Sequence, residues 1–473
     1  MNFKGILFYL GIYSFVVSFF SILNIFYSLY FNFLLDLRSY FYCLAISFSV
    51  GIILSFIGKK FSKNLNLYDQ LFLAIIGFFF IPLLISIPFN FSIHNFSFMN
   101  AYFESISGFS CTGFSIIQNL ENINQPLLIW RSSSQWLGGI FYLVTIVSVL
   151  GNKKIKINPS YLINQDFDTS NFYSDFFGNC TKIIIPYVVL SSIIFFLIML
   201  SGVRFFDGFN LTLSIISAGG FLTQNNLGNI IKNDLQTLVL SITLIFPILN
   251  IYFFPKAIIN KFQIREFFED FYLIAILLIF LTFFYFVSDL SESFPNTLLI
   301  ITSSFSTSGI AFQDMQSNYY FLFIILTILG GSALSTSSGL KFIRVYVLFK
   351  YSMIELSKTS RPLNVINKKL FFGHLKVQDD DEKISFFIFI TFLLLLFILA
   401  GLLTAGIPDL ENAFTLSILT LTNTLASSIY NLSDLDFFNL NHSSKISLII
   451  FMILGKFELL GVLILFKKFI IRE

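Results

Sequence analysis

Long apolar segments recur along the whole chain, and each has about the length that an α-helix needs to cross a bilayer, ~20 mainly apolar residues. Over the 473 residues the mean hydropathy is +0.82, and only 12% of the residues are charged, about half the share of a soluble domain. The sequence therefore predicts an all-α polytopic membrane protein. Its ten spans are expected at about 6–31, 39–58, 69–89, 127–150, 181–202, 235–259, 271–288, 319–349, 384–405 and 445–466.

The Lys and Arg residues predict how these spans are oriented, because basic residues concentrate in cytoplasmic loops. With the N-terminus inside, all but six of the 29 basic residues fall on the inner side. Five fall outside and one lies within the last span: Arg38, Arg131, Arg204, Lys232 and Lys445, and then Lys456. Both termini are expected in the cytoplasm, and the first span is expected to be retained rather than cleaved as a signal peptide.

The remaining composition narrows the class of protein. Acidic residues dominate the outer segments, and a negative vestibule raises the local cation concentration, although each acid alone could simply solvate a loop. Cys43, Cys111 and Cys180 are too scattered for a metal site or a disulfide framework. The chain has no phosphate-binding glycine motif, so an ion gradient, the membrane potential or a separate subunit must supply any energy. An enzyme is not expected.

Four outer segments share one pattern, an apolar stretch of helix length followed by a turn of small and hydroxyl residues. They read AYFESISGFSCTGFS (101–115), FNLTLSIISAGGFLT (209–223), PNTLLIITSSFSTSGIAF (295–312) and ENAFTLSILTLTNTLASS (411–428). Three of the turns reach a glycine that precedes an apolar residue: Gly113, Gly220 and Gly309. The pattern predicts two N-terminal helices (1–68) and four repeats of span, short helix, turn and span (69–177, 178–270, 271–383 and 384–473).

Physical constraints limit what these turns can do. Irregular backbone cannot face lipid, and it survives at membrane depth only inside protein or along a watery path. Four such turns that converge on one axis would form a ring of carbonyl oxygens, which can replace the hydration shell of a monovalent cation. Glycine supplies the positive φ that this arrangement needs. A single turn of this kind would more often serve helix packing, but four at corresponding places favour a pore.

These segments resemble the pore loops of the Trk/Ktr/HKT superfamily of potassium transporters. FESISGFSCTGFS resembles the first pore loop, WRSSSQWLGGIFYLV (130–144) the start of the following helix, SAGGF (217–221) the second loop and SFSTSGIAF (304–312) the third. GGSALSTSSGLKFIRVYVL (330–348) resembles the broken helix of the third repeat. The resemblance covers about 69–470, and the two extra N-terminal spans are similar to those of the bacterial Trk-type pore subunit.

The resemblance implies an ion filter in which Gly113, Gly220 and Gly309 match the family's filter glycines. The implied filter residues are Cys111, Thr112, Gly113, Ala218, Gly219, Gly220, Thr307, Ser308, Gly309, Leu425 and Ala426. Potassium, the transported ion, would be held at Thr112, Gly113, Gly219, Gly220, Ser308, Gly309 and Leu425. No organic cofactor is implied.

The resemblance also implies a gating loop across the pore, from Gly330 to Gly339. Its residues would include Gly330, Gly331, Ser332, Ser335, Thr336 and Gly339. The residues alone agree, because GGSALSTSSG interrupts a span that is apolar on both sides; a kink that only adjusts packing is the alternative. Lys456 occupies the place of a basic residue in the family's last helix. A lysine in mid-span indicates function, here a barrier to cations, unless it snorkels to the inner interface.

The fourth turn departs from the family pattern Asn-Asn-x-Gly-Pro-Gly. The chain reads NTLASS from Asn423 to Ser428, and no glycine occurs between Gly406 and Gly455. This alignment places Ala426 at the filter position. An alanine at positive φ carries a strain of roughly 1–2 kcal/mol, or else the turn relaxes and a carbonyl leaves the ring. The sequence therefore predicts weaker discrimination of potassium over sodium, and Ala426→Gly should change the relative permeability of the two ions.

The leading functional prediction is a pore-forming subunit for potassium uptake in the bacterial inner membrane. A secondary transporter coupled to H⁺ or Na⁺ is the alternative, and a poorly selective Na⁺/K⁺ conduit is another. A membrane enzyme would need clustered His, Cys or acidic residues inside the membrane, and the sequence shows none beyond Glu458. The resemblance implies a homodimer and a cytoplasmic nucleotide-binding regulatory subunit (TrkA-like), with no nucleic-acid partner. The basic inner segments Lys153–Lys156 and Lys350–Lys376 could dock that subunit or meet anionic membrane lipids.

Overall fold

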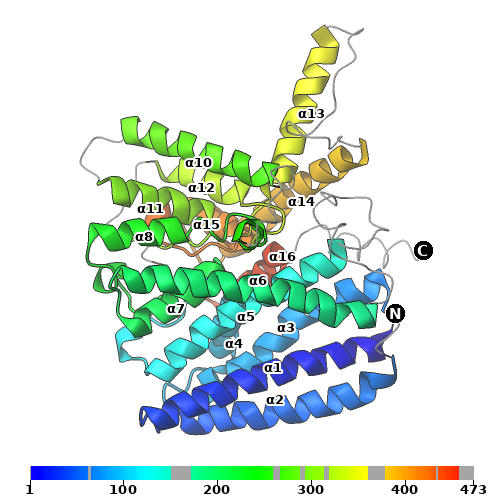
Figure 1. Cartoon of the computed structure of the whole chain (residues 1–473), viewed down its shortest axis with the longest axis vertical. Helices are drawn as coiled ribbons and strands as arrows, with labels where there is room; N and C mark the ends of the chain where they lie inside the picture. Colours follow the sequence, from blue (N-terminus) through cyan, green and yellow to red (C-terminus); the bar gives the residue numbers. More distant parts are fainter. Residues whose placement is uncertain are drawn as a thin grey trace.

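A computed structural model describes residues 2–61, 65–150, 172–258, 267–287, 293–313, 319–360, 379–432 and 435–457. Helices make up the regular structure of this described part, which contains no strand. Figure 1 shows the longer helices packed side by side, with α1 (Phe3–Tyr30) and α2 (Leu37–Gly58) together at one edge of the bundle. The predicted all-α polytopic fold is confirmed.

Six helices in the described part are long and apolar enough to cross a membrane. They are α1, α2, α3 (Leu67–Phe91), α6 (Phe172–Leu200), α10 (Phe268–Val287) and α14 (Asp379–Leu403). A further helix, α5 (Gln125–Leu150), has a similar length. It carries a polar run from Arg131 to Gln135 whose residues are buried inside the protein. The polar residues of α5 therefore face neighbouring helices rather than lipid.

Four short helices each precede one of the predicted turns. They are α4 (Phe98–Phe109), α7 (Phe205–Ile216), α11 (Phe294–Phe305) and α15 (Leu410–Leu421), each of 12 residues. A helix of that length is about 18 Å long, too short to cross a bilayer, so each one ends inside the protein. The predicted repetition of a short helix and a turn is present four times.

The predicted span 235–259 is wrong as a continuous helix. It consists of α8 (Asp234–Thr243), an irregular segment 244–252 and α9 (Phe253–Ile258). Pro247 lies in the irregular segment and has no backbone N–H to continue a helix. The freed carbonyls of Pro247 and Ile248 accept hydrogen bonds from the N–H groups of Ser337 and Ser332, at 3.1 and 2.9 Å. The break in this span is thus paired with the predicted gating loop.

The predicted span 319–349 is broken by that loop, as the sequence indicated. It consists of α12 (Tyr320–Leu329) and α13 (Phe342–Ser360), with residues 330–341 between them outside any helix. The last span begins as α16 (His442–Lys456), and its predicted continuation beyond residue 457 lies outside the described residues. Figure 1 shows that α13 extends beyond the body of the bundle, beside α14.

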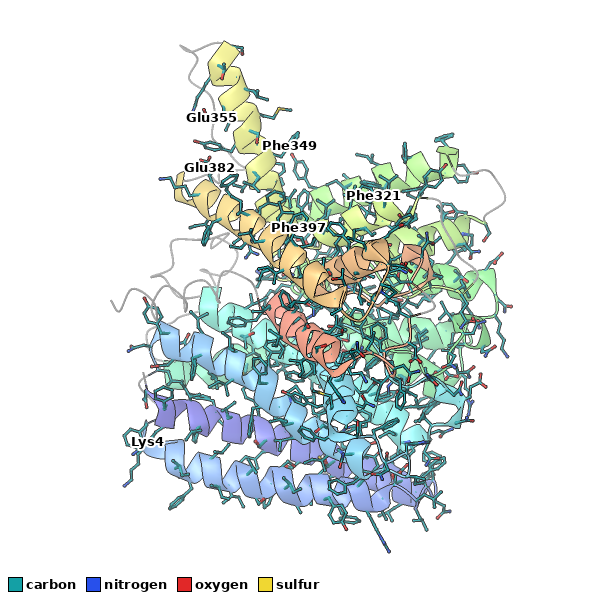
Figure 2. All side chains as sticks on the ribbon, turned by 180° about the vertical axis from the view of Figure 1, so that it is seen from behind. Lys4, Phe321, Phe349, Glu355, Glu382 and Phe397 are labelled. Atoms are coloured by element: carbon teal, nitrogen blue, oxygen red, sulfur yellow. The ribbon has the colours of Figure 1, made fainter. Side chains whose placement is uncertain are left out.

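The distribution of apolar side chains is that of a protein in lipid. Large apolar side chains such as Phe321, Phe349 and Phe397 are exposed at the surface, as Figure 2 shows. The interior, in contrast, contains many buried Ser and Thr side chains. A soluble domain would expose few contiguous apolar groups. The surface therefore fits a hydrocarbon environment.

Candidate functional site

The four turns that follow the short helices share one backbone conformation. Their first residues all have positive φ, of 57, 56, 61 and 48° at Cys111, Ala218, Thr307 and Asn423. The residue after each of these donates its N–H to the carbonyl five residues back, at 2.9–3.1 Å: Thr112 to Ser107, Gly219 to Ser214, Ser308 to Ser303 and Thr424 to Leu419. The equivalent segments Cys111–Gly113, Ala218–Gly220, Thr307–Gly309 and Asn423–Leu425 are called the four-turn ring below.

The third residue of three turns is a glycine, with φ of 86° at Gly113, 77° at Gly220 and 67° at Gly309. A methyl group on any of them would collide with a carbonyl oxygen of another turn. Gly113 would meet Gly219, Gly220 would meet Ser308, and Gly309 would meet Leu425. Each turn therefore abuts the next in the order of the repeats. This order places the four turns around a common axis, and glycine is required by both the positive φ and the close contact.

In the fourth turn the third residue is Leu425, and the prediction that placed Ala426 there is wrong by one residue. The hydrogen bond from Thr424 to Leu419 fixes the register, because its counterparts fix that of the other turns. Ala426 corresponds instead to Phe114 and its equivalents, one position after the ring. Neither Leu425 nor Ala426 has a positive φ, so the expected strain at Ala426 is absent and the fourth turn has relaxed at Leu425.

We expect Gly220→Ala to abolish most ion flux and to destabilise the protein by about 1–2 kcal/mol through backbone strain alone. The new methyl group would also collide with the carbonyl of Ser308. Gly401→Ala is the matched control, because a methyl group there meets no atom within 4 Å and alanine favours the helix. Flux in proteoliposomes and the melting temperature in detergent measure both effects. Wild-type flux in Gly220→Ala would show that close contact in the ring is unnecessary.

One buried glutamine on α5 braces the second turn. Gln135 donates from Nε2 to the carbonyl of Gly219 at 2.6 Å, and its Oε1 accepts from the N–H of Phe221 at 3.3 Å. A carbonyl oxygen has two lone pairs, so this hydrogen bond leaves Gly219 one more for an ion. The sequence resemblance covered Gln135 without indicating this contact.

The first and fourth turns are joined by Asn423. Its Nδ2 donates to Oγ1 of Thr112 at 2.9 Å and to the carbonyl of Met452 at 2.8 Å. Asparagine tolerates positive φ better than most residues, which suits the φ of 48° at Asn423. The fourth turn is therefore anchored at its first residue, although it lacks a glycine at its third.

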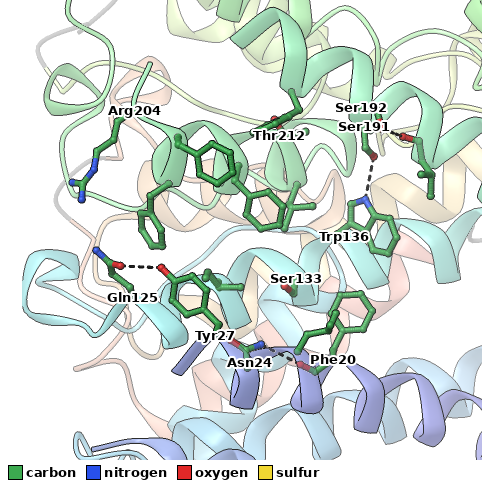
Figure 3. A pocket seen from close by; sticks show the side chains of 18 of the residues that line it. Phe20, Asn24, Tyr27, Gln125, Ser133, Trp136, Ser191, Ser192, Arg204 and Thr212 are labelled. Carbon is green, nitrogen blue, oxygen red and sulfur yellow. Dashed lines mark hydrogen bonds between the residues drawn. The ribbon is translucent and has the colours of Figure 1, made fainter. Parts of the chain in front are cut away.

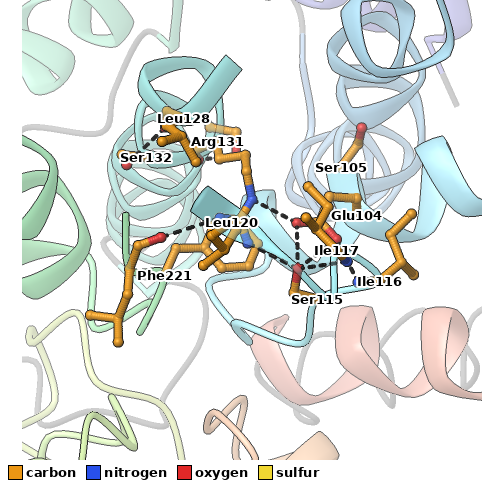
Figure 4. Close-up of polar contacts among 12 residues, drawn as sticks. Glu104, Ser105, Ser115, Ile116, Ile117, Leu120, Leu128, Arg131, Ser132 and Phe221 are labelled. Atoms are coloured by element: carbon orange, nitrogen blue, oxygen red, sulfur yellow. Dashed lines mark hydrogen bonds and ion pairs between the residues drawn. The ribbon is translucent and has the colours of Figure 1, made fainter. Parts of the chain in front are cut away.

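A buried ion pair holds the segment after the first turn, as Figure 4 shows. Arg131 on α5 and Glu104 on α4 are 2% and 1% exposed, and Arg131 Nε donates to Glu104 Oε1 at 2.8 Å. Glu104 also accepts from the Ser115 hydroxyl at 3.1 Å and from the N–H of Ile116 at 2.9 Å. The sequence places Glu104 in the outer segment 101–115 and Arg131 at the outer end of the span 127–150, and nothing in the sequence pattern pairs them.

The same arginine reaches the second turn. Arg131 Nη1 donates to the carbonyl of Leu222 at 3.3 Å, and its guanidinium lies 4.1 Å from the centre of the Phe221 ring. Such a cation–π contact adds to the ion pair. Arg131 therefore links the segments that follow the first and second turns.

The predicted gating loop forms a closed excursion whose two ends meet. Gly330 and Gly339 both have positive φ, of 63 and 87°, and the N–H of Phe342 donates to the carbonyl of Gly331 at 3.1 Å. The C-terminal part of the loop contacts the ring, because the N–H of Ser338 donates to Oγ1 of Thr307 at 3.0 Å. Thr336 also donates to the carbonyl of Ile216, at the end of α7, at 2.7 Å. The loop thus lies directly against the ring.

Three charged side chains hold this loop. Lys456, 1% exposed, donates from Nζ to the carbonyl of Thr336 at 3.2 Å and to Ser338 Oγ at 3.1 Å. Lys341 Nζ donates to the carbonyl of Ser337 at 2.7 Å. Glu269 on α10 accepts from the N–H of Ala333 at 3.2 Å. Lys456 therefore lies beside the loop as expected, and the snorkelling alternative is wrong; Lys341 and Glu269 were not predicted.

A separate cavity of about 890 Å³ lies between α1, α5, α6 and α7, shown in Figure 3. Its lining is mainly aromatic and aliphatic, with Tyr27 and Gln125 joined by a hydrogen bond of 2.9 Å. None of the residues of the four-turn ring lines it. This cavity therefore offers no set of oxygen ligands for a cation comparable to the ring.

Within the described residues, no group of three or more His, Cys, Asp or Glu side chains could hold a metal ion. The four-turn ring brings together backbone carbonyls and hydroxyl groups, which are the kind of oxygen that can replace the hydration shell of a monovalent cation. Four helix C-termini, each with a partial negative charge, also end at this ring.

Comparisons with known proteins find relatives among cation transporters, although no family model matches the chain. The chain is 28% identical over 404 residues to the Trk system potassium uptake protein TrkG of Escherichia coli, covering 80% of each chain. It is 26% identical over 415 residues to an uncharacterized cation transporter of Methanocaldococcus jannaschii, covering 85% of this chain and 83% of that protein. TrkH of Escherichia coli is 24% identical over 447 residues, 90% of this chain.

A solved structure has the same fold. The crystal structure of the potassium transporter TrkH from Vibrio parahaemolyticus matches 98% of each chain with a TM-score of 0.84, at 21% sequence identity. The sequence relatives and this fold point to one group of proteins. The chain is a multi-pass helical membrane protein with the fold of TrkH, and its sequence is similar to those of Trk system potassium uptake proteins.

Proposed function

We propose that the chain is the pore-forming subunit of a potassium uptake system, through which the ion moves down its electrochemical gradient. The four-turn ring carries this proposal, because four backbone segments from four parts of the chain abut one another around one axis. The names of the relatives, potassium uptake proteins, support potassium as the ion. An enzymatic activity is not proposed.

In this proposal backbone oxygens replace the water around the ion. The ligands would be oxygens of Thr112, Gly113, Gly219, Gly220, Ser308, Gly309 and Leu425. The loop from Gly330 to Gly339 would act as the gate beneath the ring, and Lys456 would act as a positive barrier that the ion must pass. Coupling of potassium to H⁺ or Na⁺ is the second candidate, and the relaxed fourth turn favours weaker rejection of sodium than four glycines would give.

The assembly and location are part of the same proposal. We place the chain in a bacterial inner membrane with both termini in the cytoplasm, as a homodimer gated by a cytoplasmic nucleotide-binding subunit. The basic inner loops that could contact this subunit or lipid headgroups fall largely on segments 151–171 and 361–378, outside the described residues. Of the basic residues in question, Lys350 and Lys358 lie on α13, among the described residues.

Reconstituted proteoliposomes test the function directly. We expect uptake of ⁸⁶Rb⁺, a potassium analogue, to rise with an inward-negative potential and to be unaffected when the H⁺ and Na⁺ gradients are collapsed. Competition by external K⁺ should be stronger than competition by Na⁺. Uptake no greater than that of empty vesicles would contradict the conduit, and dependence on an H⁺ or Na⁺ gradient would favour the coupled transporter.

A further inference from the structure

The side chain of Leu425 occupies the place where the three ring glycines face one another. A methyl group on Gly113 would lie 3.3 Å from Leu425 Cβ and 3.3 Å from its Cδ1. A methyl group on Gly220 would lie 3.0 Å from Cβ and 3.3 Å from Cδ2, and one on Gly309 would lie 2.9 Å from Cβ. One side chain of the fourth turn thus reaches the glycines of all three other turns.

These contacts locate the side chain on the axis of the ring. The three glycines belong to three different repeats and have equivalent positions around the axis, so a group within contact of all three lies near its centre. The two methyl groups of Leu425 point to two different glycines, Gly113 and Gly220. The absence of side chains at these glycines makes the space that Leu425 fills.

An isobutyl group on the axis opposes what the ring would do for a cation. It offers no oxygen to replace water, and hydrophobic constrictions close pores by excluding water. Resting on the proposed function, we infer that Leu425 is an apolar plug of the filter, which an ion can pass only when the fourth turn moves its third residue off the axis. The fourth turn is then a gate in addition to the loop beneath the ring.

The anchors of the fourth turn allow such a movement. Asn423 is fixed to Thr112 and Met452, and Ser428 Oγ donates to the carbonyl of Phe312 at 2.6 Å. Leu425 lies between these two anchors and is only half-buried, whereas the other residues of the ring are buried. The plug therefore sits at an accessible face of the ring, and it can be displaced while both anchors remain in place.

The test compares Leu425→Gly with Ala426→Gly in proteoliposomes that contain the full chain. Both variants add a glycine to the same turn, but only Leu425→Gly clears the axis. We expect ⁸⁶Rb⁺ uptake to rise about 10- to 100-fold in Leu425→Gly, the factor that corresponds to displacing one apolar side chain from its contacts. Ala426→Gly should stay within about twofold of the wild type, a free-energy difference below RT. Equal uptake by the wild type and Leu425→Gly would overturn the plug and leave the conduit intact.

A second measurement guards against a variant that misfolds. In Leu425→Cys, a membrane-impermeant charged thiol reagent should block uptake, while the wild type should be unaffected because Cys111, the cysteine of the ring, is fully buried. Full activity after complete modification of the introduced thiol would overturn the inference. Uptake in Leu425→Gly but not in the wild type would support the plug. Uptake in none of the chains would contradict the proposed function, and the plug with it.

Discussion

Replacing Arg131 with methionine should lower the free energy of unfolding by about 3–5 kcal/mol, the usual cost of leaving one member of a buried ion pair without its partner. The carboxylate of Glu104 would remain 1% exposed with its cation gone. The hydrogen bond to Leu222 and the contact with Phe221 would also be lost, so the exits of two turns would separate. We therefore expect a large fall in the melting temperature in detergent, together with loss of potassium flux.

The double variant Glu104→Gln with Arg131→Met separates the ion pair from simple packing. It removes both charges, and replacing a buried pair by neutral residues often costs little, so its melting temperature should lie well above that of Arg131→Met. Arg204→Met is the matched control, because Arg204 is exposed and exposed charges contribute little to stability. Equal losses in Arg131→Met and Arg204→Met would mean that the buried pair does not stabilise the protein.

The repetition in this chain was predictable because the same order of residue types, an apolar stretch followed by small and hydroxyl residues, recurs four times in the sequence. Each short helix and its turn is a local unit, and a glycine that needs positive φ is visible in the sequence as such. Gly113, Gly220 and Gly309 therefore stand where the sequence placed them in their turns. The boundaries of the four repeats stay a prediction.

Other features depend on contacts that no local pattern encodes. The break around Pro247 was hidden because an apolar composition continues through it. The break frees backbone carbonyls from helical hydrogen bonds. They are tolerated inside the membrane because a loop some 85 residues further along the chain donates hydrogen bonds to them. Glu104 and Arg131 lie in separate outer-side segments of the sequence, and only the packing of α4 against α5 brings them together.

The register of the fourth turn shows a third kind of limit. A family pattern assigns positions by residue type, and matching Asn423 to the first asparagine of Asn-Asn-x-Gly-Pro-Gly puts Ala426 at the glycine. In the structure, the register of the turn is instead set by its distance from the end of α15, through the hydrogen bond from the N–H of Thr424 to the carbonyl of Leu419. This register puts Leu425 at the position of the ring glycines, and its large side chain then enters the ring where the other turns have none.

Replacing Lys456 with methionine should accelerate ion flux. The residue is the last of α16, and its ammonium group donates to Thr336 and Ser338 of the loop, which contacts the ring at Thr307. Two like charges about 8 Å apart repel by about 2 kcal/mol at an effective dielectric constant of 20. If the passing ion comes this close to Lys456, removing the lysine charge would speed its passage about 30-fold. Losing two hydrogen bonds to the loop also favours its open arrangements, so both consequences act in the same direction.

The conservative variant separates charge from size, because Lys456→Arg retains the positive charge and the capacity to donate to both loop oxygens. We expect its ⁸⁶Rb⁺ uptake to remain close to that of the wild type, while Lys456→Met is faster at the same membrane potential. The two variants should differ less at potentials that already drive the ion strongly inward. If arginine and methionine raised uptake equally, the fit of the side chain against the loop, rather than its charge, would control passage. If neither changed uptake, the ion would not pass near Lys456, and the path through the centre of the four-turn ring would have to end elsewhere.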